Sequence, residues 1–257
     1  MEKIPGRIIR QMGFIAESRG LMERYIRVEG AWIDHLRRTR EYIINAVKGK
    51  KFENLAVLGS GWLLDLPLEE LVAISDHVWL IDAVHPAQVI HKLRKYRNCT
   101  AVWTDITGGC LKNAWQAVKQ YRRNGLKATP ENICNATFQP VPFPDYVISL
   151  DLLSQIGDMI TDYLRKKIPY TQEEVTRIHR LLQQAHLDFL PPGKSCLVTD
   201  YLETNVDLSN GRAETLELLS IDLPDTPQTQ TWEWQFDPEG NYRPGRRTIL
   251  QVTARQL

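Results

Sequence analysis

The sequence has few of the features that mark metal-binding or disulfide-rich proteins. Only four of its 257 residues are cysteines, at Cys99, Cys110, Cys134 and Cys196, and no CxxC pair occurs. None of them stands at zinc-finger spacing from a histidine, so neither a disulfide scaffold nor a metal site is indicated. We therefore expect reduced thiols in a cytoplasmic protein that has no metal ligand set.

Long hydrophobic runs and a large net charge are also missing. The longest apolar runs, such as 55–58 and 146–150, are too short to span a bilayer. No signal peptide is visible at the N-terminus. Lys plus Arg is 32 and Asp plus Glu is 31, a net charge of +1, which disfavours a uniformly basic nucleic-acid binder. The 43% hydrophobic and 25% charged residues are typical of a globular chain.

The small net charge is the sum of two unlike segments. Residues 1–53 hold 12 Lys/Arg and 7 Asp/Glu, a net of +5, whereas residues 54–257 have a net of −4. In the first segment apolar residues recur at helical spacing, and Gly30 divides two predicted helices. The sequence therefore predicts an N-terminal helical cap over 1–53 and a second domain over 54–257.

From residue 54 onward, short apolar strands alternate with helices. Five strands separated by helical crossovers predict an α/β fold with a mostly parallel sheet. Two further strands joined by turn residues predict an antiparallel terminal pair, which makes seven strands in all. The predicted strands are 54–58, 78–81, 100–104, 145–150, 195–200, 231–236 and 248–253. Ligands of such sheets bind beyond the carboxyl ends of the strands.

Glycines and acids stand at these strand ends. Gly59-Ser60-Gly61 follows the first strand, and two glycines allow a tight turn and close approach of a ligand to the backbone. Asp82 lies 21 residues beyond Gly61 and can accept both hydroxyl hydrogens of a ribose. Asp105 follows the third strand and can accept a hydrogen bond from an adenine amino group. The pattern favours an adenosine-containing cofactor.

These segments resemble the class I S-adenosylmethionine-dependent methyltransferases, a family with a Rossmann-like fold. The resemblance covers about residues 54–257. It is carried by 56–61 (AVLGSG), 80–82 (LID), 104–106 (TDI), 145–150 (DYVISL), 190–194 (LPPGK) and 197–200 (LVTD). It implies S-adenosylmethionine as the cofactor, with Gly59 and Gly61 beside its methionine part, Asp82 on the ribose and Asp105 near the adenine. The implied cofactor contacts are Gly59, Ser60, Gly61, Asp82, Asp105, Ser149 and Leu150, of which the last two border the transferred methyl group.

The chain also departs from the family pattern. The glycine run lacks a further glycine, and no Asn-Pro-Pro-Tyr-type motif follows the fourth strand. The second departure disfavours methylation of DNA bases or glutamine and leaves an unidentified small molecule as the expected acceptor. Methyl transfer itself requires mainly in-line alignment of nucleophile, methyl carbon and sulfur. A general base is needed only when the acceptor must lose a proton.

Candidate bases are His35, His85 and Asp151. His35 shares a predicted helix with Trp32, and the two form a candidate substrate cap that closes over the sheet edge and excludes water. Each of these residues also has a purely structural interpretation. His35 could belong to a solvated or packed face of an amphipathic helix, His85 could cap or stack at a helix start, and Asp151 could cap a helix. No oligomeric state is indicated.

Three other functions stay open. A non-catalytic methyltransferase-like binding protein is one, because the glycine loop is altered. An NAD(P)-dependent oxidoreductase is another, because Tyr163 and Lys167 stand at Tyr-xxx-Lys spacing with Ser149 upstream. The third is RNA methylation, for which basic residues of the first segment could meet phosphates. These basic residues are Arg37, Arg38, Arg40, Lys48, Lys50 and Lys51.

Overall fold

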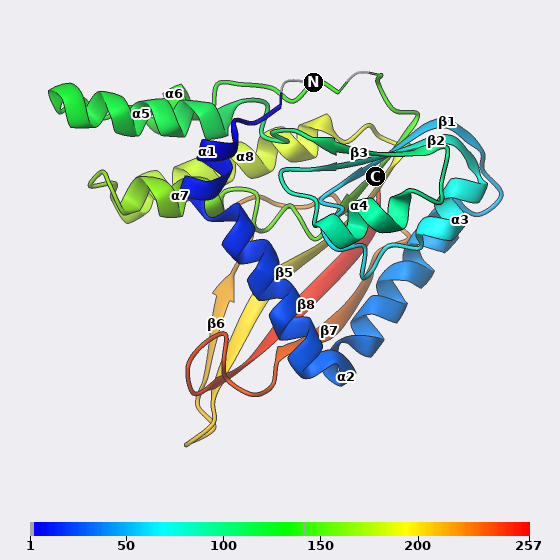
Figure 1. Ribbon diagram of the computed structural model, residues 1–257. Helices are drawn as coiled ribbons and strands as arrows, with labels where there is room; N and C mark the ends of the chain where they lie inside the picture. Colours follow the sequence, from blue (N-terminus) through cyan, green and yellow to red (C-terminus); the bar gives the residue numbers. More distant parts are fainter. Residues whose placement is uncertain (1–2, 141) are drawn as a thin grey trace.

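Eight strands form one mixed sheet in the computed structural model, which describes residues 3–140 and 142–257 (Figure 1). Their order is β3-β2-β1-β4-β5-β8-β7, with β6 paired to β5 off this path. Strands β1 to β5 are parallel, whereas β8 runs antiparallel to both β5 and β7. The strands are β1 (Phe52–Leu58), β2 (Ser75–Asp82), β3 (Cys99–Trp103), β4 (Tyr146–Leu150), β5 (Ser195–Asp207), β6 (Ala213–Glu217), β7 (Gln230–Asp237) and β8 (Arg246–Gln256).

This topology confirms the predicted Rossmann-like α/β fold with an antiparallel terminal pair, but the predicted number of strands was too low. Strand β5 continues to Asp207 instead of ending at Asp200, and its extension pairs with β6 as well as with β8. Every residue of β6 is exposed, so its sequence lacks the apolar alternation by which a half-buried strand is recognised. Figure 1 shows β5, β6 and β8 extending beyond the other strands of the sheet.

Helices cover both faces of the sheet (Figure 1). Along β1, Leu55 and Val57 pack with α2, α3 and α4, whereas Ala56 and Leu58 pack with α1, α5, α6, α7 and α8. This alternation follows from the period of two along a strand. The helices are α1 (Gly6–Met12), α2 (Phe14–Val47), α3 (Leu68–Ala73), α4 (Ala87–Leu93), α5 (Cys110–Asn124), α6 (Pro130–Ile133), α7 (Asp158–Arg165) and α8 (Gln172–Phe189).

The N-terminal segment is helical, as predicted, but it is divided at a different residue. Gly13, with φ +93°, separates α1 from α2, and the helix continues through Gly30. A bend at Val28, where φ is −121°, divides α2 into two arms (Figure 1). The second arm packs against β7 and belongs to the same apolar core as the sheet. In the described part of the chain, no helix is both long and apolar enough to span a bilayer.

Candidate functional site

The glycine loop after β1 is packed tightly against the end of β4. Gly59 has φ +80°, and a Cβ atom at this position would lie 2.5 Å from the Leu150 carbonyl oxygen. Only glycine fits such a backbone contact at this φ. The strand order reverses its direction here: β2 and β3 lie on one side of β1, and β4 and β5 lie on the other. The loop therefore occupies the switch point at which α/β sheets bind ligands.

Asp82 holds this loop from the end of β2. Its Oδ2 atom accepts a hydrogen bond from the Gly61 N–H at 2.9 Å, and its Oδ1 atom accepts one from the Val84 N–H at 3.2 Å. Burial raises the pKa of Asp82 above its ordinary value. The carboxylate thus joins the ends of β1 and β2, which are adjacent in the sheet.

A cavity of about 380 Å³ opens beside this junction. It lies between the first arm of α2 and the two loops, and Trp62 closes one side by donating its indole N–H to the Ser18 carbonyl at 2.7 Å. Its lining is Ile15, Ser18, Arg19, Met22, Glu23, Trp62, Val84, Pro86 and Gln88. Its volume is within the range of small-molecule sites, which is roughly 300–1,000 Å³.

Two carboxyl groups and a histidine meet on the β4 side of the glycine loop. One side-chain atom each from His35, Asp65 and Asp151 lies within 4.8 Å of the other two. Asp151 directly follows β4 and has φ +43°, a conformation that is uncommon for a non-glycine residue and is often associated with functional sites. We call Asp65 and Asp151 the acid pair.

Asp65 lies in the loop between β1 and α3 and does not cap that helix. Helix α3 begins at Leu68, and Pro67 occupies its N-cap position. Asp65 therefore precedes the first turn by too many residues to accept a hydrogen bond from its backbone. Its side chain faces Asp151 instead. Asp65 was not among the residues predicted for the site, because nothing in its local sequence indicates that this loop meets the end of β4.

Burial sets the charge state of this group. Burial and repulsion from Asp151 raise the pKa of Asp65 to about 8. Burial also raises the pKa of Asp151 to about 7. The pKa of His35 falls to about 4, again because of burial. Near neutral pH the acid pair thus shares a proton and the imidazole is uncharged.

A hydrogen bond from β7 fixes the tautomer of His35. The Trp232 indole N–H donates to Nδ1 at 3.1 Å, and an indole nitrogen can only donate. Nδ1 is therefore unprotonated, and the neutral ring carries its proton on Nε2, which lies 3.5 Å from Asp151 Oδ2. A protonated Nε2 has no lone pair for a metal ion. The arrangement thus favours a hydrogen-bond donor over a metal ligand, although the three side chains are close enough to surround a cation.

Aromatic rings from β7 pack against His35 and Trp32 of α2. The His35 ring stacks on Trp234 with centroids 3.8 Å apart, and the Trp32 N–H donates to the Phe236 carbonyl at 2.9 Å. Trp32 and His35 are each only 1% exposed. The two candidate cap residues therefore lie together on α2, packed against the edge strand β7.

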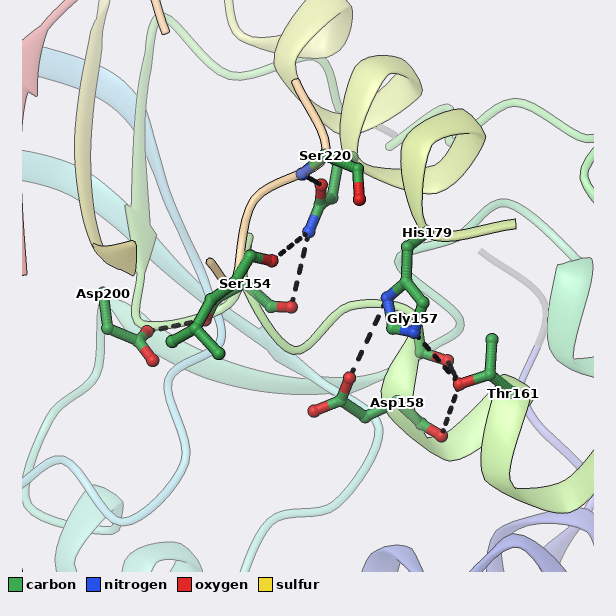
Figure 2. Close-up of polar contacts among 9 residues, drawn as sticks. Ser154, Gly157, Asp158, Thr161, His179, Asp200 and Ser220 are labelled. Atoms are coloured by element: carbon green, nitrogen blue, oxygen red, sulfur yellow. Dashed lines mark hydrogen bonds and ion pairs between the residues drawn. The ribbon is translucent and has the colours of Figure 1, made fainter. Parts of the chain in front are cut away.

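A third carboxyl group, Asp200, approaches from β5. Its Oδ1 atom accepts a hydrogen bond from the Ser154 hydroxyl at 2.6 Å, and burial raises its pKa. Figure 2 shows this contact. The Gln183 amide of α8 donates to the Ser154 carbonyl at 3.5 Å and accepts from the Ser220 backbone N–H at 2.7 Å. The same view shows His179 against Gly157, where a Cβ would lie 2.6 Å from Nδ1. These contacts anchor the loop between β4 and α7.

Three other sequence-predicted residues make different contacts. The Ser149 hydroxyl is hydrogen-bonded to His186 of α8 at 2.8 Å. His85 donates from Nε2 to the Val102 carbonyl at 3.1 Å. Asp105 accepts from the Thr107 and Leu111 backbone N–H groups at 2.9 and 3.2 Å, next to the start of α5. The structure thus gathers the glycine loop, Asp82, Leu150, Asp151 and His35, and it places His85 near Asp82. The predicted cofactor contacts of Ser149 and Asp105 stay predictions.

The residues behind the alternative functions are also engaged elsewhere. Tyr163 is buried in the core between α7 and the neighbouring helices, and Lys167 Nζ lies over its ring, 4.1 Å from the centroid. Arg37 and Arg38 form ion pairs with Asp34 on their own helix at 2.5 and 2.7 Å. Neither a Ser-Tyr-Lys catalytic group nor a row of unpaired arginines at Arg37 and Arg38 is formed.

Solved structures similar to this chain include several methyltransferases. N-methyltransferase NodS from Bradyrhizobium japonicum, with S-adenosyl-L-homocysteine, is 13% identical, with 84% of this chain and 85% of that chain covered and a TM-score of 0.39. The 1,6-didemethyltoxoflavin-N1-methyltransferase of Burkholderia thailandensis is 12% identical, with 100% and 92% covered and a TM-score of 0.42. The DhpI–SAM–HEP complex is 12% identical, with 98% and 100% covered and a TM-score of 0.41. No protein-family model and no curated protein sequence matches the chain.

Proposed function

We propose that the protein binds S-adenosylmethionine at the switch point and transfers its methyl group in line to a small molecule. The observation that carries this proposal is the junction of Gly59, Gly61 and Asp82 beside the 380 Å³ cavity. A glycine loop leaves the backbone open to a ligand, and a carboxylate at the end of the next strand suits ribose hydroxyls. Asp105 is left out of the proposed contacts, because it lines a different cavity of about 170 Å³ and not the one beside Gly61 and Asp82.

The charge of the site supports a cationic cofactor. Asp65 lies in the loop after β1, Asp151 directly after β4 and Asp200 within β5, and none of them forms an ion pair with a lysine or arginine among the described residues. A sulfonium placed near such a group is stabilised by the carboxylates. Burial of the reacting atoms under α2 would exclude water and hold the sulfur, methyl carbon and nucleophile in line.

Calorimetric titration with S-adenosylmethionine and S-adenosylhomocysteine tests the proposal. We expect binding of both, and an affinity at least about tenfold lower for Asp82→Asn, because the amide keeps only one acceptor oxygen. Asp76→Asn, at an exposed position of β2, is the matched control and should bind as the wild type does. Absence of binding at millimolar ligand would contradict the proposal. Binding of reduced nicotinamide dinucleotide in its place would support the oxidoreductase alternative.

A non-catalytic binding protein is distinguished by turnover. Such a protein would bind S-adenosylmethionine but form no S-adenosylhomocysteine with any acceptor. Both kinds of protein bind the cofactor, so binding alone does not separate the two functions.

A further inference from the structure

The site around the acid pair holds more buried carboxyl groups than the basic groups of the chain neutralise. The groups that face it come from four elements, namely His35 on α2, Asp65 after β1, Asp151 after β4 and Asp200 on β5, and Asp34 lies on the outer side of α2. His35 is the one basic group among them, and it is uncharged near neutral pH. Buried carboxylates are ordinarily paired with a cation. A positive group from outside the chain would complete this site.

Two buried polar atoms of this group have no hydrogen-bond partner among the described residues. Within the described residues, neither His35 Nε2 nor Asp151 Oδ1 makes a hydrogen bond, and His35 is 1% exposed. Buried polar atoms are almost always satisfied in folded proteins. The Ser60 hydroxyl in the glycine loop is another buried atom without a partner among the described residues.

The backbone at the acid pair is also strained. Asp151 and Leu63 are the two non-glycine residues with positive φ among the described residues, at +43° and +59°. Leu63 precedes Asp65 in the same loop, so both acids are presented by unusual backbone. Such positions cost free energy, on the order of 1–3 kcal/mol each, and they concentrate at functional sites.

We propose that the methyl acceptor is a small amine, which enters as its ammonium ion and gives its proton to the Asp65–Asp151 pair. This inference rests on the proposed function, because it names the substrate of that reaction. An ammonium ion supplies both the missing positive charge and the hydrogen-bond donors for Asp151 Oδ1. The Trp234 ring stacks on His35, and Trp32 packs edge-on against Trp234, so apolar rings support the imidazole from behind.

The reaction balances as follows in atoms and charge. An N–H bond of the ammonium breaks, and its proton joins the ionised carboxylate of the acid pair. The freed nitrogen lone pair forms a bond to the methyl carbon of S-adenosylmethionine, while the S–CH3 bond breaks and its electrons stay on sulfur. The products are a methylated ammonium ion and neutral S-adenosylhomocysteine. The proton leaves the carboxyl pair for water before the next turnover.

Asp65 and Asp151 are the catalytic residues of this proposal, and His35 is a positioning residue. Its Nε2 proton faces Asp151 and stabilises the ionised carboxylate, and the Trp232 N–H keeps the ring in that tautomer. Loss of the Nε2 donor would make the pair more basic. The rate would then need a higher pH for the carboxylate to be ionised.

The test measures S-adenosylhomocysteine formation with a panel of primary and secondary amines and with alcohols and carboxylates of the same carbon skeletons. Benzylamine, benzyl alcohol and benzoate form one such set. We expect turnover with amines alone, and kcat/KM should rise about tenfold per pH unit at low pH and level off above about pH 7. Turnover with an alcohol or carboxylate but no amine would overturn the proposal. So would a lack of turnover with every amine in a protein that binds S-adenosylmethionine. Failure to bind the cofactor at all identifies a failure of the proposed function instead.

Variants separate catalysis from folding. Asp151→Asn and Asp65→Asn should each lower kcat by at least about a hundredfold while cofactor affinity stays within a few-fold. His35→Phe keeps a ring against Trp234 but removes the donor, so the pH at which kcat/KM levels off should move upward. Asp76→Asn should match the wild type. Unchanged amine turnover in both acid variants would refute the catalytic role of Asp65 and Asp151. An unshifted pH profile in His35→Phe would refute the positioning role of His35.

Discussion

Asp105 and Asp151 both follow the carboxyl end of a parallel strand, yet their surroundings are opposite. Asp105 accepts hydrogen bonds from Thr107 and from the Leu111 N–H, so its own turn and the start of α5 satisfy it. Asp151 faces a second carboxyl group, and its Oδ1 atom has no partner in the described chain. An acid at a strand end is therefore a structural group in one case and a candidate reactive group in the other. The difference lies in what the rest of the fold brings to it.

The largest effects on the free energy of unfolding should come from Gly59, which packs against the end of β4 before Asp151, and from Gly108 in the Asp105 turn. A Cβ at Gly59 would lie 2.5 Å from the Leu150 carbonyl oxygen, and one at Gly108 would lie 2.3 Å from the Thr137 carbonyl carbon. We expect Gly59→Ala and Gly108→Ala each to lower the free energy of unfolding by about 3 kcal/mol or more in urea denaturation. Equal losses would show that the two turns are equally rigid and that only their carboxylates differ.

Gly211→Ala is the control for these substitutions. Gly211 has φ +75° but no atom within 4 Å of the added Cβ, so only the conformational cost remains. We expect a loss of about 1 kcal/mol. If Gly59→Ala and Gly108→Ala cost only as much, the backbone of both turns must move to accept the Cβ atom. The two turns would then not be rigid.

A smaller effect, of opposite sign, is expected at Asp151. Folding raises the pKa of Asp151 to about 7 and that of Asp65 to about 8. Both exceed the ordinary value of about 4, so the folded state takes up protons and loses stability as the pH rises from about 4 to 8. Asp151→Asn should increase the free energy of unfolding at pH 8 by on the order of 2 kcal/mol. Asparagine also tolerates positive φ.

Urea unfolding at pH 5 and pH 8 measures this difference. The gain should shrink at pH 5, where the wild-type pair already holds its protons, and Asp76→Asn should show no change at either pH. A destabilised Asp151→Asn at pH 8 would place this residue in the same structural class as Asp105. A gain in stability together with lost turnover would instead be the trade-off expected of a functional site.

The smallest effect is expected at Asp105. Asp105→Ala removes the acceptor of two backbone N–H groups and should cost about 1–2 kcal/mol in thermal or urea unfolding. Asp105→Asn keeps one acceptor and should cost about half as much. Affinity for S-adenosylhomocysteine, measured alongside, should stay within about twofold of the wild type. A tenfold loss of affinity would instead support the contact between Asp105 and the adenine that the family resemblance implies.

Much of the fold could be read from local pattern, since strand and helix periods are set by backbone geometry. Strands β1 to β4 lie within three residues of their predicted positions. The exposed strand β6 has no such pattern, and the division of the N-terminal helices depends on Gly13 adopting positive φ. Exposed pairing and backbone conformation leave little trace in hydrophobic periodicity.

The sequence by itself determined the α/β class, the glycine loop and the strand-end acids, because these follow from local periodicity and residue chemistry. It named Asp151 and His35 as candidates without indicating that they meet. Only the tertiary structure placed His35 of α2 beside Asp65 and Asp151, and only β7 fixed its tautomer through Trp232, which lies 197 residues away. Whether a carboxylate is capped or left unpaired depends on neighbours distant in the chain. Burial and partners of that kind are properties of the folded molecule, not of the local sequence.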